Sequence, residues 1–278
     1  MFTLNCNGRL LVIDRPVVMG IINVTPDSFY EGSRFSDTGK ILNKVERMIS
    51  EGADIIDVGG QSTRPGSEQI PAEEEKRRVV GVIEAIHNNF PEVFLSIDTF
   101  YSEVAEFCVH AGAGMVNDVS GGTMDDEMIA TVAKLKVPYV IMHIQGTPQN
   151  MHEHTSYENV TTEVLDYFIR KKENCQSSGI NDVIIDPGFG FAKVGPQNFE
   201  LLRNLAIFKM LDAPLMVGIS RKSSVYKTLG VSAEEALNGT TVLNTIALMN
   251  GAAILRVHDV KEATEAIKLC GLIRPSSF

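Results

Sequence analysis

PVVMGII, residues 16–22, is a run in which apolar and mostly β-branched side chains follow one another with a single glycine between them. A strand with one face in water alternates apolar with polar residues, whereas a strand covered on both faces is apolar almost throughout. The run therefore predicts a strand that is buried on both faces, as strands are in parallel sheets. Asn23 follows it directly and begins a polar stretch without helical periodicity.

Further runs of this kind are spaced along the chain, and longer amphipathic segments separate them. In residues 102–113, for example, Val104, Phe107, Cys108 and Ala111 fall on one face of a helix. Repeated strand–helix units without a break in composition predict an α/β fold, a closed (β/α)8 barrel that forms one domain over residues 1–278; a doubly wound open sheet is the alternative. The further runs are ADIIDV (53–58), VFLSID (93–98), GMVND (114–118), PYVIMH (138–143), DVIIDP (182–187), PLMVGIS (214–220) and AAILRVH (252–258).

Local signals outside these runs add detail to the barrel. Asn7 and Gly8 lie between two strand-like segments, which predicts an N-terminal β-hairpin, and we expect it to cover the bottom of the barrel. Ser232 and Glu235 have the spacing of a capping box at a helix start. The segment TTVLNTIALMNGAA, residues 240–253, is apolar enough for a subunit interface, but a barrel helix buried on its own strands would have the same composition.

Composition and charge restrict the possible partners. The chain has 278 residues and a formal net charge of −10, which argues against nucleic acid and acidic membrane surfaces as partners. No apolar stretch reaches the ~20 residues of a membrane span, and the N-terminus has no secretion-signal pattern. The four cysteines are far apart, which predicts reduced thiols in a cytoplasmic protein.

Polar residues stand at, or just after, the end of every predicted strand. Because a (β/α)8 barrel carries its active site at the carboxyl ends of its strands, we expect these side chains to meet at one mouth. Any one of them could be a helix cap, but burying all of them without partners would cost about 1–3 kcal/mol each, so their convergence predicts a bound ligand. The set comprises Asn23, Asp57, Asp98, Asn117, Asp118, His143, Asp186, the segment SRKS (220–223), Arg256 and His258.

Two kinds of chemistry can be separated among the candidate residues. One group offers mixed hydrogen-bond donors and acceptors that suit the edge of a flat heterocycle, because a carboxylate can accept two parallel N–H bonds. The other group suits a phosphate or pyrophosphate with a divalent cation. Together they predict a phosphorylated pterin-like or purine-like substrate. The first group is Asp98, Asn117, Asp186 and Lys222, and the second is Arg64, Arg256, His258 and Asn23.

Eight segments resemble, in the same order, the signature segments of the dihydropteroate synthase family of pterin-binding barrel enzymes. The resemblance implies a transferase of folate biosynthesis that forms a C–N bond between para-aminobenzoate and 6-hydroxymethyl-7,8-dihydropterin pyrophosphate, releasing pyrophosphate. It also implies a sulfonamide target, a Mg²⁺ cofactor and a homodimer formed through the late helices. The segments are INVTPDSF (22–29), GGQSTRPG (59–66), SIDT (96–99), VNDVSGG (116–122), MHIQGTP (142–148), DPGFGFAK (186–193), SRKS (220–223) and RVHDV (256–260).

The resemblance implies a role for each matched residue. The catalytic set would be Asp98, Asp186, Lys222, Arg256 and His258. The pterin would be bound by Asp98, Asn117, Met142, Asp186 and Lys222. Pyrophosphate would be bound by Asn23, Arg64, Arg256 and His258, with Asn23 also holding magnesium. The aminobenzoate would be bound by Thr63, Pro65, Phe191, Lys222 and Ser223.

A mobile loop after the first strand would complete this site. Asp27, Phe29 and Glu31 lie on it, and the loop would close over the reacting groups and exclude water. The sequence departs from the family at a few positions, among them Glu31, where the family often has Asp, and Gln61, where it commonly has Glu. Neither change removes a group that the chemistry needs.

The joined groups suggest the mechanism. An aromatic amine is a weak nucleophile, so the pterin methylene must be strongly activated, and we expect an SN1-like loss of pyrophosphate with positive charge spread into the pterin ring. The enzyme would contribute positioning and electrostatic stabilisation, without a covalent intermediate.

The same residues bear on alternative functions. A zinc hydrolase of the amidohydrolase kind needs two histidines after the first strand, where this chain has Asn23-Val24-Thr25. His143 is predicted to be a hydrogen-bonding core residue in preference to a metal ligand. A folate-dependent corrinoid methyltransferase would share the pterin carboxylates but not the anion site, and a non-catalytic pterin-binding paralogue would keep binding without turnover.

Overall fold

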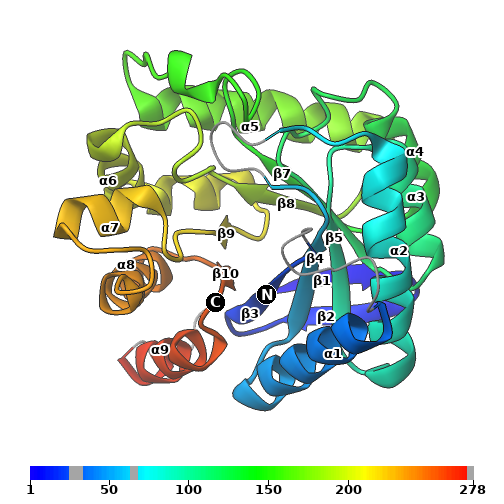
Figure 1. The fold of residues 1–278 in the computed structure, drawn as a ribbon. Coiled ribbons are helices and arrows are strands. Elements are labelled where there is room, and N and C mark those ends of the chain that lie inside the picture. The colour runs from blue at the N-terminus through cyan, green and yellow to red at the C-terminus, as the bar shows by residue number, and fades with distance from the viewer. Residues whose placement is uncertain (25–33, 63–67, 274–278) are drawn as a thin grey trace.

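The computed structural model describes residues 1–24, 34–62 and 68–273. The central feature is a ring of parallel strands surrounded by helices (Figure 1). Its strands are β3 (Val17–Asn23), β4 (Ile55–Gly59), β5 (Phe94–Asp98), β6 (Met115–Asp118), β7 (Tyr139–Met142), β8 (Val183–Asp186), β9 (Met216–Val217) and β10 (Ile254–Val257). The helices are α1 (Arg34–Glu51), α2 (Ala72–Asn89), α3 (Ser102–His110), α4 (Met128–Leu135), α5 (Val160–Ser177), α6 (Gly195–Arg203), α7 (Ser223–Leu229), α8 (Leu237–Met249) and α9 (Val260–Ile273), with short 3-10 helices at Met151–Glu153 and Leu205–Leu211.

The strand order establishes that the sheet is a barrel. All pairings within it are parallel, and the order is β8-β7-β6-β5-β4-β3-β10-β9. Its two ends meet through a parallel bridge between Ile185 and Leu215, supported by a hydrogen bond of 3.0 Å from the Ile185 N–H to the Pro214 carbonyl. The predicted (β/α)8 barrel is therefore confirmed, and the open doubly wound sheet was wrong.

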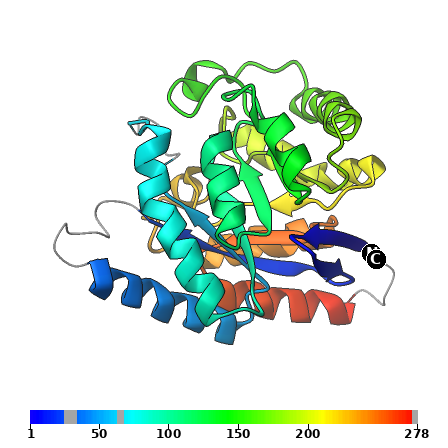
Figure 2. The same ribbon diagram turned by 90° about the vertical axis from the view of Figure 1, so that its right-hand side faces the viewer.

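The predicted N-terminal hairpin is also confirmed. Strands β1 (Phe2–Cys6) and β2 (Arg9–Ile13) pair antiparallel, and Asn7 and Gly8 at the turn have φ of 54° and 83°, as a two-residue type I′ turn requires. The hairpin lies across the amino-terminal end of the barrel (Figures 1 and 2). Leu4, Leu11 and Ile13 from the hairpin share one apolar cluster with inward-facing strand residues, so the hairpin closes the barrel floor.

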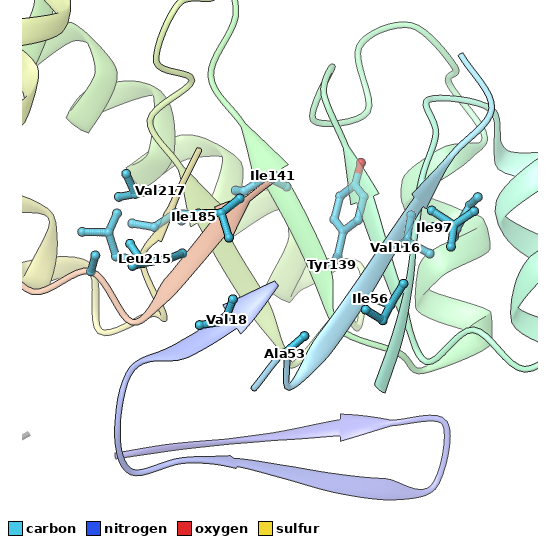
Figure 3. Close-up of a cluster of buried hydrophobic side chains, with 14 of the residues drawn as sticks. Val18, Ala53, Ile56, Ile97, Val116, Tyr139, Ile141, Ile185, Leu215 and Val217 are labelled. Atoms are coloured by element: carbon cyan, nitrogen blue, oxygen red, sulfur yellow. The ribbon is translucent and has the colours of Figure 1, made fainter. Parts of the chain in front are cut away.

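A second, larger core fills the space between the strands and the helices. Outward-facing side chains such as Val18, Ile56 and Ile97 pack in it, together with buried positions of the surrounding helices (Figure 3). Each fully buried aliphatic side chain contributes about 1.5–3 kcal/mol relative to an exposed one, so this layer supplies most of the fold's stability. Within the described residues, no helix has the length and apolarity needed to cross a membrane.

Two local features differ from the sequence-based expectation. The run at 214–220 forms a strand only at Met216–Val217, because the chain turns after Gly218 and the Lys222 N–H bonds to the Ile219 carbonyl. In α3 the side chain of Phe107 is 47% exposed, not inward, and Lys76 Nζ lies 4.4 Å from its ring centroid.

Candidate active site

Inward-facing polar side chains form a ring at the carboxyl-terminal mouth of the barrel. Successive side chains of a strand point to opposite faces, so in β4 Ile55 and Asp57 face the barrel interior while Ile56 and Val58 face the helices. The same alternation turns one polar side chain inward from each of four other strands, β5, β6, β8 and β10. The ring consists of Asp57, Asp98, Asn117, Asp186 and Arg256.

Arg256 links two neighbouring carboxylates of this ring. Its Nε donates to Asp57 Oδ2 at 2.7 Å and its Nη2 donates to Asp98 Oδ2 at 2.5 Å. Asn117 Nδ2 donates to the same Asp57 oxygen at 3.0 Å. Asp57 Oδ1, by contrast, is buried without a hydrogen-bond partner among the described residues. The guanidinium that sequence analysis assigned to the pyrophosphate thus lies directly against a carboxylate that it assigned to the pterin.

Asp186 and Lys222 form the other side of the mouth. Asp186 Oδ1 accepts the Gly188 N–H at 2.8 Å, and Lys222 Nζ donates to the Phe189 carbonyl at 2.5 Å. A Cβ placed on Gly218 would lie 3.8 Å from Asp186 Oδ2 and 3.9 Å from Lys222 Nζ. Both charged atoms therefore border the space above Gly218, which a side chain at that position would fill.

The charges at the mouth are strongly desolvated. Burial raises the pKa of Asp98 to about 7, although the neighbouring Arg256 opposes this change. Burial also raises the pKa of Asp186 and lowers the pKa of Lys222 to about 8. A flat ligand edge with N–H donors beside a carbonyl oxygen would provide the hydrogen bonds that water no longer supplies.

Further polar groups lie on the rim. Asn23 is exposed at the end of β3, and His258 directly follows β10, where its backbone N–H donates to Ser220 Oγ at 3.2 Å. Desolvation at the rim, with the nearby cations Arg256 and Lys44, lowers the pKa of His258 to about 4. An oxygen-rich anion bound here would meet a positive local field despite the acidic chain as a whole.

Apolar side chains line the mouth beside Asp186 and Lys222. Phe191 is half-buried, with its ring centroid 4.5 Å from Lys222 Nζ, and Ser223 is exposed as the first residue of α7. Met142 belongs to a small apolar cluster above the strands. Its other buried members are Phe100, Val119, Ile144, Met151 and Ala192.

Part of the predicted site lies outside the described residues. This applies to Asp27, Phe29, Glu31, Thr63, Arg64 and Pro65. Close in sequence to Thr63, Arg64 and Pro65, the side chain of Gln61 is described. Its Nε2 donates to the Glu68 carbonyl and its Oε1 accepts the Ile70 N–H, both at 3.2 Å. A Glu at this position could accept but not donate, so the departure from the family pattern provides one additional bond.

Asp57 was predicted to lie at the mouth but was assigned to neither the pterin nor the pyrophosphate group, yet this residue is central to the ring. The available signal was the alternation itself, since Asp57 is two residues after Ile55, an apolar residue of the barrel floor. Sequence analysis likewise singled out neither Lys44 nor Lys193. Lys193 Nζ lies 2.9 Å from His143 Nδ1 and donates to the carbonyls of Gly188 and Phe191 at 3.1 and 3.0 Å.

His143 is indeed a hydrogen-bonding core residue. It is only 3% exposed, and burial lowers its pKa to about 2. Burial likewise lowers the pKa of its partner Lys193 to about 7. Together the two side chains fasten the loop after β8 to the end of β7.

Comparisons with known proteins identify the family of this chain. A family model described as "Pterin binding enzyme" matches residues 19–258. Dihydropteroate synthase of Escherichia coli (strain K12) is 42% identical over 264 residues, covering 94% of this chain and 93% of that protein. The chain belongs to the dihydropteroate synthase family.

Solved structures of the family share this fold. Dihydropteroate synthase of Yersinia pestis, solved with a sulfonamide drug complex, superposes with a TM-score of 0.92 at 40% identity over 99% of this chain and 100% of that one. The Xanthomonas albilineans dihydropteroate synthase with 4-aminobenzoic acid has a TM-score of 0.91 at 38% identity, covering 99% of both chains. The same enzyme has also been solved with 7,8-dihydropteroate, with a TM-score of 0.86 at 34% identity and 99% coverage of both chains.

Proposed function

We propose that this chain condenses 6-hydroxymethyl-7,8-dihydropterin pyrophosphate with para-aminobenzoate to give 7,8-dihydropteroate and pyrophosphate. One observation carries the proposal: Asp98, Asn117, Asp186 and Lys222 meet around one mouth, with Arg256 among them, in a chain of the dihydropteroate synthase family. The individual residue roles below are part of the proposal.

The pterin would bind by its edge inside the ring. Asp186 and Asp98 would accept its N–H groups, and Asn117 would add a donor and an acceptor. Lys222 Nζ, close to the Asp186 carboxylate, would donate to the carbonyl oxygen of the ring. Met142 would supply an apolar contact from the buried cluster.

The pyrophosphate would bind at the rim. Arg256, His258 and Arg64 would provide positive charge and N–H donors. Binding an anion next to His258 would raise its pKa and favour its charged form.

The residues at this rim suit a magnesium ion that takes few ligands from the protein. The described residues include no group of three His, Cys, Asp or Glu side chains that could hold a metal ion. Mg²⁺ commonly keeps several waters and binds substrate phosphates with few protein ligands, which agrees with the single amide oxygen of Asn23. When bound, the ion would neutralise charge that develops on the leaving pyrophosphate.

The aminobenzoate would lie against the loop after β8. The Phe191 ring would pack on the aromatic ring, and Ser223 and Lys222 would face the carboxylate, together with Thr63 and Pro65. The Yersinia pestis relative that was solved with a sulfonamide drug supports the expectation that sulfonamides compete for this position.

The reaction would proceed by an SN1-like path. The methylene C–O bond breaks first and its electron pair leaves with the pyrophosphate; the amine lone pair then forms the C–N bond, and the amine proton leaves to solvent. Asp98 and Asp186 would stabilise the positive charge on the pterin, and Arg256 would stabilise the leaving anion. The loop bearing Asp27, Phe29 and Glu31 would exclude water.

The test is pyrophosphate release with each substrate supplied alone and together. Release that requires para-aminobenzoate, with formation of dihydropteroate, is the expected result. A corrinoid methyltransferase would release no pyrophosphate, and a non-catalytic paralogue would bind pterin without turnover. Either outcome would refute the proposal.

The assembly and location of the enzyme are further parts of the proposal. A homodimer is supported by the late helices, where Val242 and Ile246 of α8 are 51% and 39% exposed and Leu269 of α9 is 64% exposed. Light scattering should give twice the chain mass, and polar substitutions at Val242 and Ile246 should give the monomer. All four cysteines are buried thiols outside any disulfide bond, which supports a reducing, cytoplasmic location.

A further inference from the structure

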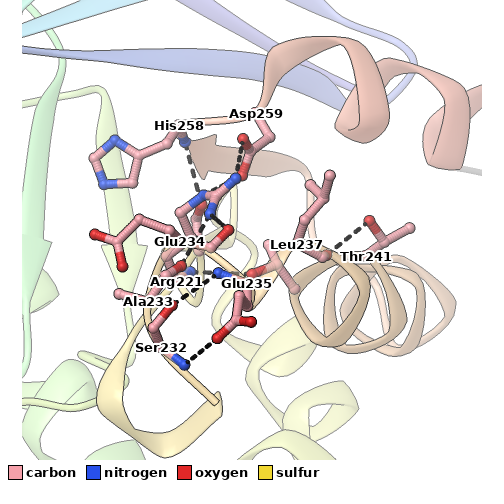
Figure 4. Close-up of polar contacts among 11 residues, drawn as sticks. Arg221, Ser232, Ala233, Glu234, Glu235, Leu237, Thr241, His258 and Asp259 are labelled. Carbon is pink, nitrogen blue, oxygen red and sulfur yellow. Dashed lines mark hydrogen bonds and ion pairs between the residues drawn. The ribbon is translucent and has the colours of Figure 1, made fainter. Parts of the chain in front are cut away.

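Arg221 joins two loops of the active-site mouth. Its Nε donates to Asp259 Oδ2 and its Nη2 donates to Asp259 Oδ1, both at 2.8 Å (Figure 4). These two parallel bonds form a bidentate pair, which fixes orientation as well as distance. Arg221 directly precedes Lys222, and Asp259 directly follows His258. The pair therefore connects the aminobenzoate side of the mouth to its pyrophosphate side.

Three further donors of Arg221 are also engaged. Nη1 donates to the carbonyls of Ala233 and Glu234 at 2.9 and 2.5 Å, and the backbone N–H donates to Thr240 Oγ1 at 3.0 Å. Ser232 and Glu235 exchange the predicted capping-box bonds just beside these carbonyls, which fixes the local turn before α8. The guanidinium thus ties three chain segments together (Figure 4).

The backbone at Arg221 is held in an unfavourable conformation. Its φ is +53°, in the left-handed region that a residue with a Cβ adopts only when its surroundings enforce it. The residues on either side of this kink, Ser220 and Lys222, contact different loops. Ser220 Oγ then accepts the His258 N–H, and Lys222 Nζ reaches the Phe189 carbonyl.

We propose that Arg221 and Asp259 are positioning residues that hold the aminobenzoate-binding groups Lys222 and Ser223 at a fixed separation from the pyrophosphate-binding groups Arg256 and His258. The inference rests on the proposed function. In an SN1-like reaction the amine must already lie beside the methylene when the pyrophosphate has left, so that it captures the cation before the pyrophosphate returns, and the relative placement of the two sides therefore controls productive turnover. Four of the five proposed pterin contacts, Asp98, Asn117, Met142 and Asp186, belong to other strands and do not depend on this pair. Lys222 is the one pterin contact that the pair would position, so pterin affinity should depend on it only in part.

The experiment compares Arg221→Lys, Arg221→Met and Asp259→Asn with the wild-type enzyme. Lysine keeps the charge but cannot form the bidentate contact. Because a small misplacement of reacting groups is costly, each variant should lose about 10- to 100-fold in kcat/KM for aminobenzoate. Affinity for the pyrophosphate-free pterin alcohol should change far less. The double variant Arg221→Lys with Asp259→Asn should lose no more than the worse single variant, because both remove the same contact.

Arg15→Lys provides a matched control. Arg15 Nη2 pairs with Asp54 Oδ1 at 2.7 Å, at the opposite end of the barrel, and this substitution should leave both kinetics and pterin affinity unchanged. Wild-type turnover tests the proposed function independently. Given that turnover, a fully active Arg221→Lys variant, or equal losses of pterin affinity and kcat/KM, would overturn the positioning role, since either shows that charge or general stability is all the pair provides.

Discussion

The two ends of the barrel are made by the same strands but have opposite chemistry. On four strands the inward side chain at the floor is apolar, and the next inward side chain, two residues later, is polar. The pairs are Ile55 and Asp57, Met115 and Asn117, Ile184 and Asp186, and Ile254 and Arg256.

This difference shows how one fold separates stability from chemistry. At the floor, hairpin residues such as Leu4 and Leu11 exclude water from an apolar layer. At the mouth, buried charges depend on one another, and Asp57 still retains an oxygen that has no hydrogen-bond partner among the described residues. Desolvated charges cost stability unless they are paired, so the apolar floor, together with the larger core between strands and helices, must offset the mouth. Substitutions at the two ends should therefore have different consequences.

The largest effect on stability is expected at the floor. Ile184→Ala removes buried apolar contacts and leaves a cavity, so it should lower the free energy of unfolding by about 2–5 kcal/mol. Urea unfolding measures this change. The folded fraction should retain near-normal KM values, because the mouth is built from other side chains. An unchanged unfolding midpoint would show that the floor is not the stabilising end.

Asp186 lies two residues after Ile184 on the same strand, and Asp186→Asn should have the opposite effect: it should weaken ligand binding and leave stability unchanged or higher. The amide keeps one acceptor but presents a donor to the ligand, so affinity for the pterin alcohol should fall about 100-fold. Isothermal titration calorimetry measures this loss. The unfolding midpoint should stay the same or rise, since a desolvated charge is removed. Unchanged pterin affinity would exclude Asp186 from the binding edge.

Arg256→Ala tests the connection between the two sub-sites. Because its charge-assisted bonds to the pyrophosphate are lost, affinity for the pyrophosphate-bearing substrate should fall about 10-fold more than affinity for the pterin alcohol. The alcohol should also bind somewhat less well, because Asp57 and Asp98 lose their shared cation. Competition binding with both ligands measures the ratio. Equal losses would place the anion site elsewhere.

The smallest effect is expected from pH. The pKa of Asp98 in the folded protein is raised to about 7, above its ordinary value near 4. Below about pH 7 the folded state therefore binds the extra proton, and the stability that Asp98 contributes is lost as pH rises toward 7. Pterin N–H groups require the ionised carboxylate, so pterin affinity should rise severalfold between pH 6 and pH 8. Asp98→Asn should flatten this profile; an identical profile in the variant would assign the titration to another group.

Most of the fold could be predicted because its signals are local. Near-continuous apolar runs identified all eight strands, and Asn7-Gly8 identified the hairpin. The exceptions depend on neighbours. The seventh strand is short because a turn at Gly218 leads the chain toward Lys222. Phe107 lies on the exposed side of its helix, where Lys76 from another helix contacts its ring.

The sequence predicted which residues form the site but not which of them contact one another. Strand ends identified Asp98, Asn117, Asp186, Lys222 and Arg256, and the structure brings these side chains to one mouth. Their binding roles remain predictions.

Residue order and periodicity alone determined that strands alternate with helices, and therefore that polar strand ends face one direction. Only the closed barrel decided which of them touch, because Asp57 and Asp98 lie 199 and 158 residues before Arg256. Hydrophobic periodicity acts over a few residues and is visible in the chain itself. A contact across the barrel depends on strand register and closure, which all eight strands set together.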